Sequence, residues 1–239
     1  DPGAAPYGNF PHYSRFHPPE SRVRLLPPGL LRAVGTARPL LGIDVGCNSG
    51  ELSFALFRHL LALPAGSSQR DAPGTGHSLH LLCCDIDPAL IQRAQLSCPF
   101  PDSMSFSCLD FMDAGAREPL LRSHLRRFGR ARFDLGVCLS VTMWIHLRHG
   151  DRGLRAFLAI LAATCAFLLL EPQPWKCYRA AARRQRRAGT ADLEHFRGLT
   201  IRGDVVGEII GILTRECGME LVCCFGNTDW GRNLLLFRA

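Results

Sequence analysis

The stretch from Leu40 to Gly50 limits the possible folds of this chain more than any other part of its sequence. A short apolar run ends at Asp44, a turn rich in small residues follows, and a helical pattern begins at Glu51. A strand, a glycine turn and a helix start in this order are typical of a nucleotide-binding βαβ unit. Gly46 allows a tight turn because it has no Cβ, and Gly50 is expected to let the helix pack close to the strand.

Asn48 stands where many such loops carry a third glycine. Asparagine is one of the few other residues that tolerate a left-handed backbone, and its amide can reach a ligand. An ordinary turn of an α/β protein is the alternative interpretation. The pattern Asp-x-Gly-x-x-x-Gly after a buried strand favours a ligand-binding loop, although it does not identify the ligand.

The rest of the chain alternates apolar runs with helical patterns, which predicts a parallel sheet covered by helices. We expect strands at 40–44, 79–84, 104–109, 133–139 and 167–170, and helices at 51–63, 89–97, 119–128, 154–163, 178–188 and 206–217. Runs at 221–225 and 234–238, joined by a turn at 226–229, predict a closing antiparallel hairpin. The sequence therefore predicts an α/β fold with a seven-stranded, mostly parallel sheet. A single domain would span 1–239, with a proline- and aromatic-rich arm at 1–20.

Polar side chains follow the apolar run of every predicted parallel strand. They are Asp44, Asp85, Asp110, Ser140 and Glu171. In open α/β sheets the ligand binds beyond the carboxyl ends of the strands, where these side chains would gather. A binding site explains polar residues at one edge of the sheet better than packing does.

The acidic residues at this edge suggest an adenosine-containing ligand. Asp85 ends the second strand, where a carboxylate accepts hydrogen bonds from ribose hydroxyls. The alternative role, a carboxylate at a helix N-terminus, suits Asp87 better because it directly precedes Pro88. After the third strand, Asp110 can accept from an exocyclic amine and Phe111 can stack on adenine. Asp85 lies further from the glycine turn than the ~20 residues expected of an NAD site. The terminal hairpin also favours S-adenosylmethionine over NAD. We therefore predict the S-adenosylmethionine site of a class I (Rossmann-like) methyltransferase.

Charge and cysteine content limit the partners and the compartment. The net charge of +7 and the pI of about 9.0 permit a polyanionic partner. Of the two basic clusters, 122–132 is interpreted as a solvated helix face, whereas phosphate contact and a solvated face both stay open for 179–187. The eleven cysteines include no Cys-x-x-Cys, so we expect reduced thiols and no structural metal. No apolar run approaches the ~20 residues that a membrane span needs.

Five segments carry a specific resemblance to a known family. They read Gly-Asn-Phe-Pro-His-Tyr at 8–13, Leu-Gly-Ile-Asp-Val-Gly-Cys-Asn-Ser-Gly at 41–50, Cys-Asp-Ile-Asp at 84–87, Thr-Met-Trp-Ile-His-Leu at 142–147 and Glu-Pro-Gln-Pro-Trp at 171–175. Along almost its whole length the chain resembles the bicoid-interacting-type (Bin3-domain) RNA methyltransferases, which methylate a terminal phosphate at the 5′ end of small RNAs. The continuation at 176–183 is similar to the short, single-domain branch that acts on RNA 5′-monophosphates.

The resemblance implies a set of cofactor contacts. Tyr13 matches a tyrosine of the arm that closes over the cofactor, and Arg22 matches a residue that binds the methionine carboxylate. Together with the strand ends and the glycine turn, the expected cofactor-binding residues also include Asp44, Gly46, Asn48, Gly50, Asp85, Ile86, Asp110, Phe111 and Leu139.

The expected acceptor decides which catalytic groups are needed. A phosphate monoester has a second pKa near ~6 and is mostly dianionic at neutral pH, so it needs no general base. The protein has to hold the phosphate in line with the sulfur–methyl bond. Cationic and hydrogen-bonding side chains are therefore the catalytic candidates: Arg15, His146, Lys176 and Arg179. A backbone hydrogen bond near Trp144 is the alternative role for His146.

The resulting hypothesis is S-adenosylmethionine-dependent O-methylation of the 5′-monophosphate of small RNAs, of the tRNA or microRNA-precursor type. We expect a cytoplasmic monomer that binds a small RNA and uses neither a metal nor a membrane. Two alternatives are an RNA-binding protein that keeps the fold without catalysis and a methyltransferase with another acceptor. The intact glycine turn and Asp85 argue against the first. The lack of an Asn-Pro-Pro-Tyr or Asp-Pro-Pro-Tyr sequence after the fourth strand argues against methylation of an amine.

Overall fold

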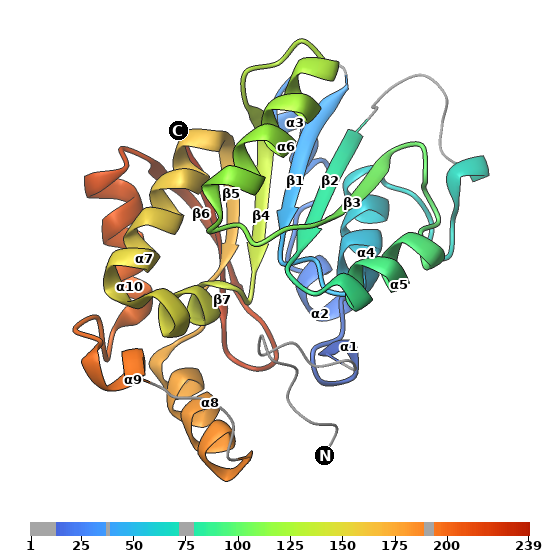
Figure 1. Cartoon of the computed structure of the whole chain (residues 1–239). Helices are drawn as coiled ribbons and strands as arrows, with labels where there is room; N and C mark the ends of the chain where they lie inside the picture. Colours follow the sequence, from blue (N-terminus) through green and yellow to red (C-terminus); the bar gives the residue numbers. More distant parts are fainter. Residues whose placement is uncertain (1–12, 37–38, 72–78, 189–193) are drawn as a thin grey trace.

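Seven strands form one sheet in the order β3-β2-β1-β4-β5-β7-β6, in a computed structural model that describes residues 13–36, 39–71, 79–188 and 194–239 (Figure 1). The first five strands run parallel, and β7 is antiparallel to both β5 and β6. The strands are β1 (Leu40–Val45), β2 (Leu79–Asp85), β3 (Met104–Cys108), β4 (Phe133–Leu139), β5 (Cys165–Glu171), β6 (Glu220–Asn227) and β7 (Asn233–Arg238). The predicted α/β fold with a mostly parallel, seven-stranded sheet is therefore confirmed.

Helices cover both faces of the sheet because its strands are apolar on both sides. One face carries α3 (Leu30–Val34), α4 (Glu51–Leu60) and α5 (Pro88–Ser97), and the other carries α6 (Ala114–Arg127), α7 (Thr142–Thr164) and α10 (Val205–Gly211). The adjacent thiols Cys83 and Cys84 belong to the two opposite cores, as expected for neighbours in a strand. Cys223 and Cys224, by contrast, are half-buried and exposed, because β6 is the edge strand.

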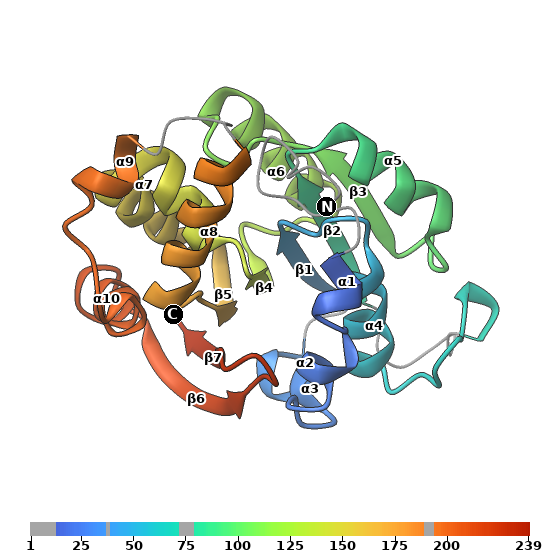
Figure 2. The ribbon, with the colours of Figure 1, turned by 90° about the horizontal axis from the view of Figure 1, so that it is seen from below.

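The carboxyl ends of the parallel strands meet at the lower edge of the sheet in Figure 1. Short helices α1 (Tyr13–Phe16) and α2 (Glu20–Val23) lie at this edge, as does the long helix α8 (Trp175–Ala188). Figure 2 views the molecule from this side, with α8 on one side of the ends of β4 and β5 and α1 with α2 on the other. The remaining short elements are α9 (Glu194–Gly198), a 3₁₀ turn (Gln69–Asp71) and a π-helical turn (Ile212–Glu216).

Several boundaries differ from the sequence-based predictions for local reasons. Helix α6 begins five residues earlier than expected, because the Asp113 carboxylate accepts from Gly115 N at 2.9 Å and caps the helix. Helix α7 includes the segment before residue 154 and is interrupted at Gly150, whose φ is +67°. The hairpin turn lies at 228–232 rather than 226–229, with Thr228 N donating to Arg232 O at 2.9 Å.

The predicted arm is partly folded. Residues 13–16 form α1 and α2 starts at Glu20, so the second half of the predicted arm at 1–20 contains helical turns. Residues 1–12 lie outside the described part of the chain. In α2, Arg22 is fully buried. Within the described residues, no helix is long and apolar enough to cross a membrane.

Candidate active site

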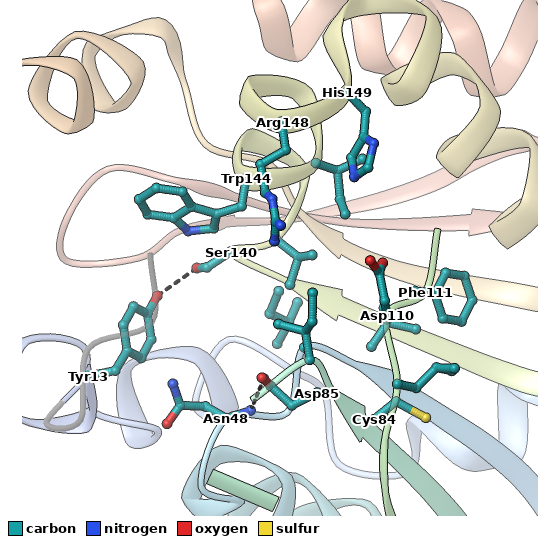
Figure 3. A pocket seen from close by; sticks show the side chains of 17 residues that line it. Tyr13, Asn48, Cys84, Asp85, Asp110, Phe111, Ser140, Trp144, Arg148 and His149 are labelled. Carbon is teal, nitrogen blue, oxygen red and sulfur yellow. Dashed lines mark hydrogen bonds between the residues drawn. The ribbon is translucent and has the colours of Figure 1, made fainter. Parts of the chain in front are cut away.

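Two pockets adjoin at the carboxyl ends of the strands. Both are lined by Tyr13, Gly46, Asn48 and Leu139. The wide pocket continues between the ends of β2 and β3 and the first turns of α7 (Figure 3). The narrow pocket continues beneath α1 and α2 and includes His17, Arg22, Asp44 and Cys47. Because the pockets share their central walls, they form one bent groove suited to a ligand with two chemically different ends.

The turn after β1 forms the centre of this groove. Gly46 has a φ of +83°, and a Cβ at this position would lie 2.3 Å from Val141 Cγ2, so only glycine fits. Asn48 has a φ of +52°, the left-handed backbone expected of it. Gly50, with a φ of +89°, lies outside both linings; a Cβ there would meet Phe54 and Ala94. Gly50 therefore allows α4 to approach α5, whereas the sequence analysis assigned it a helix–strand contact.

Asp85 lines the wide pocket at the end of β2. Its carboxylate accepts from Asn48 N at 2.8 Å and from Asp87 N at 3.0 Å, so it fixes the turn after β1 against β2. Burial raises the pKa of Asp85, although the hydrogen bonds from these amides oppose the rise. Asp87 instead caps α5 by accepting from Ala89 N at 2.9 Å, as the sequence indicated.

The far wall of the wide pocket is mostly apolar. Ile86, Asp110 and Phe111 line it from the ends of β2 and β3. Phe111 is only 5% exposed and meets Phe157 edge-on at 5.7 Å, so its ring is largely occupied by core packing. The Asp110 carboxylate accepts from Met112 N at 3.0 Å.

Helix α7 supplies the wall opposite Asp85, and the sequence analysis did not identify it. Val141, just before the helix, and Trp144, Ile145 and Arg148 within it line the wide pocket at helical spacing. In Figure 3 the Arg148 side chain extends from α7 into this pocket, with His149 beside it. The i, i+3, i+4, i+7 spacing of these residues was the signal that could have identified this wall.

The narrow pocket contains two buried charged groups. Asp44 accepts a hydrogen bond from Ser53 Oγ at 2.6 Å. Burial raises the pKa of the Asp44 carboxyl to about 6, against the effect of that hydrogen bond. Arg22 lines the same pocket, and its Nε donates to Glu171 Oε2 at 2.5 Å. The narrow pocket is thus lined by both a cation, Arg22, and a titratable acid, Asp44.

A cluster of two arginines around one carboxylate lies behind the narrow pocket. We call Arg22, Arg232, Glu171, Ser140 and Tyr13 the arginine cluster. Arg232 Nη1 donates to Ser140 Oγ at 2.6 Å and lies 3.2 Å from Glu171 Oε1. Burial favours a neutral Glu171, but the two guanidinium groups outweigh burial and lower its pKa. The sequence analysis missed Arg232, which follows a hairpin turn far along the chain.

Tyr13 joins the arginine cluster to the groove. Its hydroxyl donates to Ser140 Oγ at 2.7 Å and accepts from Arg22 Nη2 at 2.8 Å. The ring lines both pockets, so α1 closes one side of the groove.

The position of His146 does not support the catalytic role predicted for it. The side chain is fully buried, with Nδ1 3.0 Å from the Tyr178 hydroxyl and Nε2 2.7 Å from Asp151 Oδ1. Burial lowers the pKa of His146, against the effect of Asp151. It lines neither pocket, because its place on α7 turns it away from the face that carries Trp144. His146 therefore joins α7 to α8, and Asp151, its other partner, accepts from the backbone of Thr200 and Ile201 after α9.

The other predicted cations lie on the surface around the groove. Arg15 on α1 and both Lys176 and Arg179 on α8 are exposed, and none lines either pocket. The apolar side of α8, with Tyr178, is buried. Exposed cations at this edge can attract a polyanion, but their side chains do not form the walls of the groove.

The groove fits a nucleoside joined to an amino acid. The wide pocket provides a carboxylate beside apolar walls, which suits a ribose and a base. The narrow pocket provides Arg22 for a carboxylate and Asp44 for an amine. In the described part of the chain, no group of three or more His, Cys, Asp or Glu side chains could hold a metal ion.

The family model described as "Bicoid-interacting protein 3 (Bin3)" matches residues 133–239. The RNA 5′-monophosphate methyltransferase of Bos taurus is 62% identical over 243 residues, which cover 100% of this chain and 82% of that protein. The Homo sapiens protein of the same name is 60% identical over 242 residues, with the same coverage. The pre-miRNA 5′-monophosphate methyltransferase of Xenopus laevis is 52% identical over 246 residues, covering 100% of this chain and 94% of that protein.

Solved structures with lower sequence identity share the fold. The N-methyltransferase NodS from Bradyrhizobium japonicum, in complex with S-adenosyl-L-homocysteine, is similar with a TM-score of 0.55 and 18% identity. That similarity covers 95% of this chain and 90% of NodS. Magnesium protoporphyrin IX methyltransferase from Synechocystis gives a TM-score of 0.52 at 16% identity, covering 95% of this chain and 84% of that one. The fold is therefore that of the class I methyltransferases.

Proposed function

This chain belongs to the bicoid-interacting protein 3 (Bin3) family of RNA methyltransferases, and we propose that it methylates the 5′-monophosphate of small RNAs with S-adenosylmethionine. The observation that carries the proposal is the identity of about 60% to RNA 5′-monophosphate methyltransferases over the whole chain. The bent groove supports it, because S-adenosylmethionine joins a nucleoside to an amino acid.

The residues of the groove divide between the two ends of the cofactor. Asp85 would accept from the ribose hydroxyls, with Ile86, Asp110 and Phe111 around the base. Arg22 would bind the methionine carboxylate and Asp44 the amino group, while Tyr13 and Leu139 lie where the two pockets meet. The main chain at Gly46 and Asn48 would form the floor, and Gly50 would act indirectly by allowing α4 and α5 to approach.

The bound cofactor supplies a methyl group on a positively charged sulfur. The chain's own task is to position an acceptor that is already nucleophilic, because a phosphate monoester has a second pKa near ~6 and is mostly dianionic at neutral pH. A neutral hydroxyl would need a base beside it. Since His146 is buried and bonded at both ring nitrogens, the proposal assigns no general base. Methylation leaves the phosphate with one negative charge fewer.

Exposed cations at the edge of the groove would guide the RNA. Lys176 and Arg179 belong to α8 and Arg15 belongs to α1, and these two helices lie on either side of the strand ends (Figure 2). Arginine gives planar, two-point contacts to phosphate, whereas lysine acts as a point charge. These residues account for attraction and orientation of the RNA backbone, so we assign them binding rather than chemistry.

The type of RNA substrate is the one finer feature of the function on which a relative's name bears. The Xenopus laevis protein is named for pre-miRNA, which supports a microRNA-precursor type of substrate, with tRNA as the second candidate. We further propose that the protein acts in the cytoplasm as a metal-free monomer, and that residues 1–239 form one domain. None of the described residues distinguishes one small RNA from another.

Transfer from labelled S-adenosylmethionine to chemically matched RNAs tests the proposal. We expect label on an RNA with a 5′-monophosphate and none on the same RNA after phosphatase treatment. Equal labelling of both RNAs would instead indicate a base or ribose acceptor. No label on either RNA, combined with no calorimetric signal for the cofactor, would indicate an RNA-binding protein without catalysis.

A further inference from the structure

Three buried polar atoms without a hydrogen-bond partner lie in one corner of the molecule, behind the narrow pocket. They are His17 Nδ1, Trp230 Nε1 and Arg232 Nε. The ring of Trp230 lies 4.5 Å from that of His17 and 4.7 Å from the Arg22 guanidinium. Buried polar groups are nearly always hydrogen-bonded, so three unpaired groups in one corner point to a ligand that binds there.

The charge of this corner indicates the sign of that ligand. Two guanidinium groups, of Arg22 and Arg232, share the single carboxylate of Glu171, which leaves one positive charge uncompensated. The same positive charge affects His17: burial and the charges of Arg232 and Arg22 lower its pKa to about 4. Asp229, the acid of the adjacent turn, is already paired with Arg24 and with Ser21.

Helix α8 adds a further cation from the outside. The Lys176 ammonium lies 3.1 Å from where a Cβ on Gly231 would be, so it sits against the turn between Trp230 and Arg232. Arg232 Nη2 lies 3.8 Å from Cys177 Sγ, which places its guanidinium beneath the first turn of α8. The corner is therefore bounded by polar groups from three segments: His17 just after α1, the β6–β7 turn, and α8.

We propose that Trp230, Arg232 and Lys176 form the subsite that holds the acceptor phosphate, with the Trp230 and Arg232 N–H groups as its donors. The subsite adjoins the point where the two pockets meet, because Arg232 Nη1 lies 3.4 Å from the Tyr13 hydroxyl. An indole N–H and a guanidinium Nε–H donate and cannot accept, so they favour an anion over a hydroxyl. This inference rests on the proposed function, since it names the residues that would recognise the 5′-monophosphate.

The anion could instead be the carboxylate of the cofactor, which shares the same donor chemistry. Net charge favours the phosphate. Arg22, Arg232 and Lys176 together carry two positive charges more than Glu171 balances, so a carboxylate would leave one of them uncompensated. A dianion needs a second cation, and Lys176 at the same turn supplies it. The monoanionic product would then be held less tightly than the substrate, which helps its release.

The test compares binding of one 3′-labelled RNA hairpin carrying either a 5′-phosphate or a 5′-hydroxyl, with S-adenosylhomocysteine saturating. The measured quantity is the dissociation constant of the 5′-hydroxyl RNA divided by that of the 5′-phosphate RNA. Trp230→Phe keeps an aromatic ring, although a smaller one, and removes the indole N–H, and Lys176→Met changes an exposed side chain, so both should fold. We expect each to lower the ratio about tenfold, as for loss of a hydrogen bond to a charged group. Arg232→Lys should lower the ratio as well. Arg238→Gln, at the far end of β7 and paired with Glu220, should leave the ratio unchanged.

Calorimetry of S-adenosylhomocysteine on the same variants separates the two anions. Unchanged cofactor affinity with a reduced ratio supports the phosphate subsite. Reduced cofactor affinity with an unchanged ratio assigns the corner to the cofactor carboxylate and overturns the inference. An unchanged ratio in both Trp230→Phe and Lys176→Met also overturns it, provided that wild-type protein methylates the phosphorylated RNA. If wild-type protein fails in that reaction, the proposed function itself is wrong.

Discussion

The Tyr13 hydroxyl donates to Ser140 Oγ at 2.7 Å across a sequence separation of 127 residues. Through this bond the N-terminal helix α1 closes over the end of β4, where the two pockets meet. Ser140 itself has a φ of +64°, an uncommon conformation for a non-glycine residue. The same hydrogen bond therefore joins the closing helix to a strand end with an uncommon backbone conformation.

Tyr13→Phe should weaken cofactor binding without unfolding the protein. The variant keeps the ring that lines the groove and loses the bonds to Ser140 and Arg22. We expect S-adenosylhomocysteine affinity, measured by calorimetry, to fall about threefold to tenfold. Phe16→Ser changes an exposed residue of the same helix and serves as the control. Equal effects of both variants would mean that α1 acts only through its packing.

Asp85→Asn should reduce cofactor affinity by roughly tenfold or more, because it removes the charged acceptor for the ribose. Asp87→Ala is the matched control two residues later. It removes the cap of α5, which costs about 1 kcal/mol of stability, and should leave the affinity of the folded protein unchanged. A loss of affinity in the control as large as that in Asp85→Asn would refute the assignment.

Asp44 should make both stability and cofactor binding depend on pH between 4 and 7. Its pKa rises from 3.8 to about 6 on folding, so ionisation opposes folding increasingly as the pH rises through that window. The full penalty, at and above pH 7, is about 3 kcal/mol, since one pKa unit corresponds to ~1.4 kcal/mol. The Tm of Asp44→Asn relative to wild type should therefore increase from pH 4 to pH 7 in ligand-free protein.

Cofactor binding should favour the ionised form of Asp44, whereas folding favours the neutral form. An amino group beside the carboxylate favours its ionised form, so wild-type affinity for S-adenosylhomocysteine should rise with pH through about 6. The Asp44→Asn variant should lack that rise and bind more weakly at pH 7.5. Parallel pH profiles for variant and wild type, in both Tm and affinity, would show that Asp44 is not the titrating group.

His146→Gln should lower stability and leave the chemical step largely intact. The imidazole is buried between the Tyr178 hydroxyl and Asp151, so its loss leaves polar groups unpaired at a cost of about 1–3 kcal/mol. Tyr178→Phe removes one of the same bonds and should show a smaller loss of Tm. At a temperature where the variant is folded, kcat should stay within about threefold of wild type. A folded variant with a hundredfold lower kcat would restore the catalytic role.

The strand ends of the site could be predicted from sequence because they follow local rules. Asp44 and Asp85 each end an apolar run before a helix, and Asn48 occupies a turn position that only a few residue types tolerate. These patterns involve neighbours in the chain, so periodicity and turn chemistry identify them. Parallel pairing then brings the strand ends together without further information.

The missed residues depend on pairing between distant segments. Arg232 reaches the site because β7 lies between β5 and β6, an order that no local pattern specifies. On α7 the sequence analysis selected His146, whereas the groove is lined by its neighbours Trp144 and Ile145, because the rotation of the helix is fixed by packing on the sheet. Lys176 and Arg179 were predicted to hold the acceptor phosphate, and their exposed positions on α8 do not by themselves show which phosphate they contact.

Mass spectrometry of the 5′ nucleotide tests most directly whether the methyl acceptor is the terminal phosphate. The substrate is a single 5′-monophosphorylated hairpin, reacted with unlabelled S-adenosylmethionine. We expect the added mass of methyl on the terminal phosphate, no added mass when the RNA is dephosphorylated beforehand, and a strong reduction of the methylated fraction in Asp85→Asn. Methyl groups found on a base or a ribose, or equal methylation of the dephosphorylated RNA, would contradict the account.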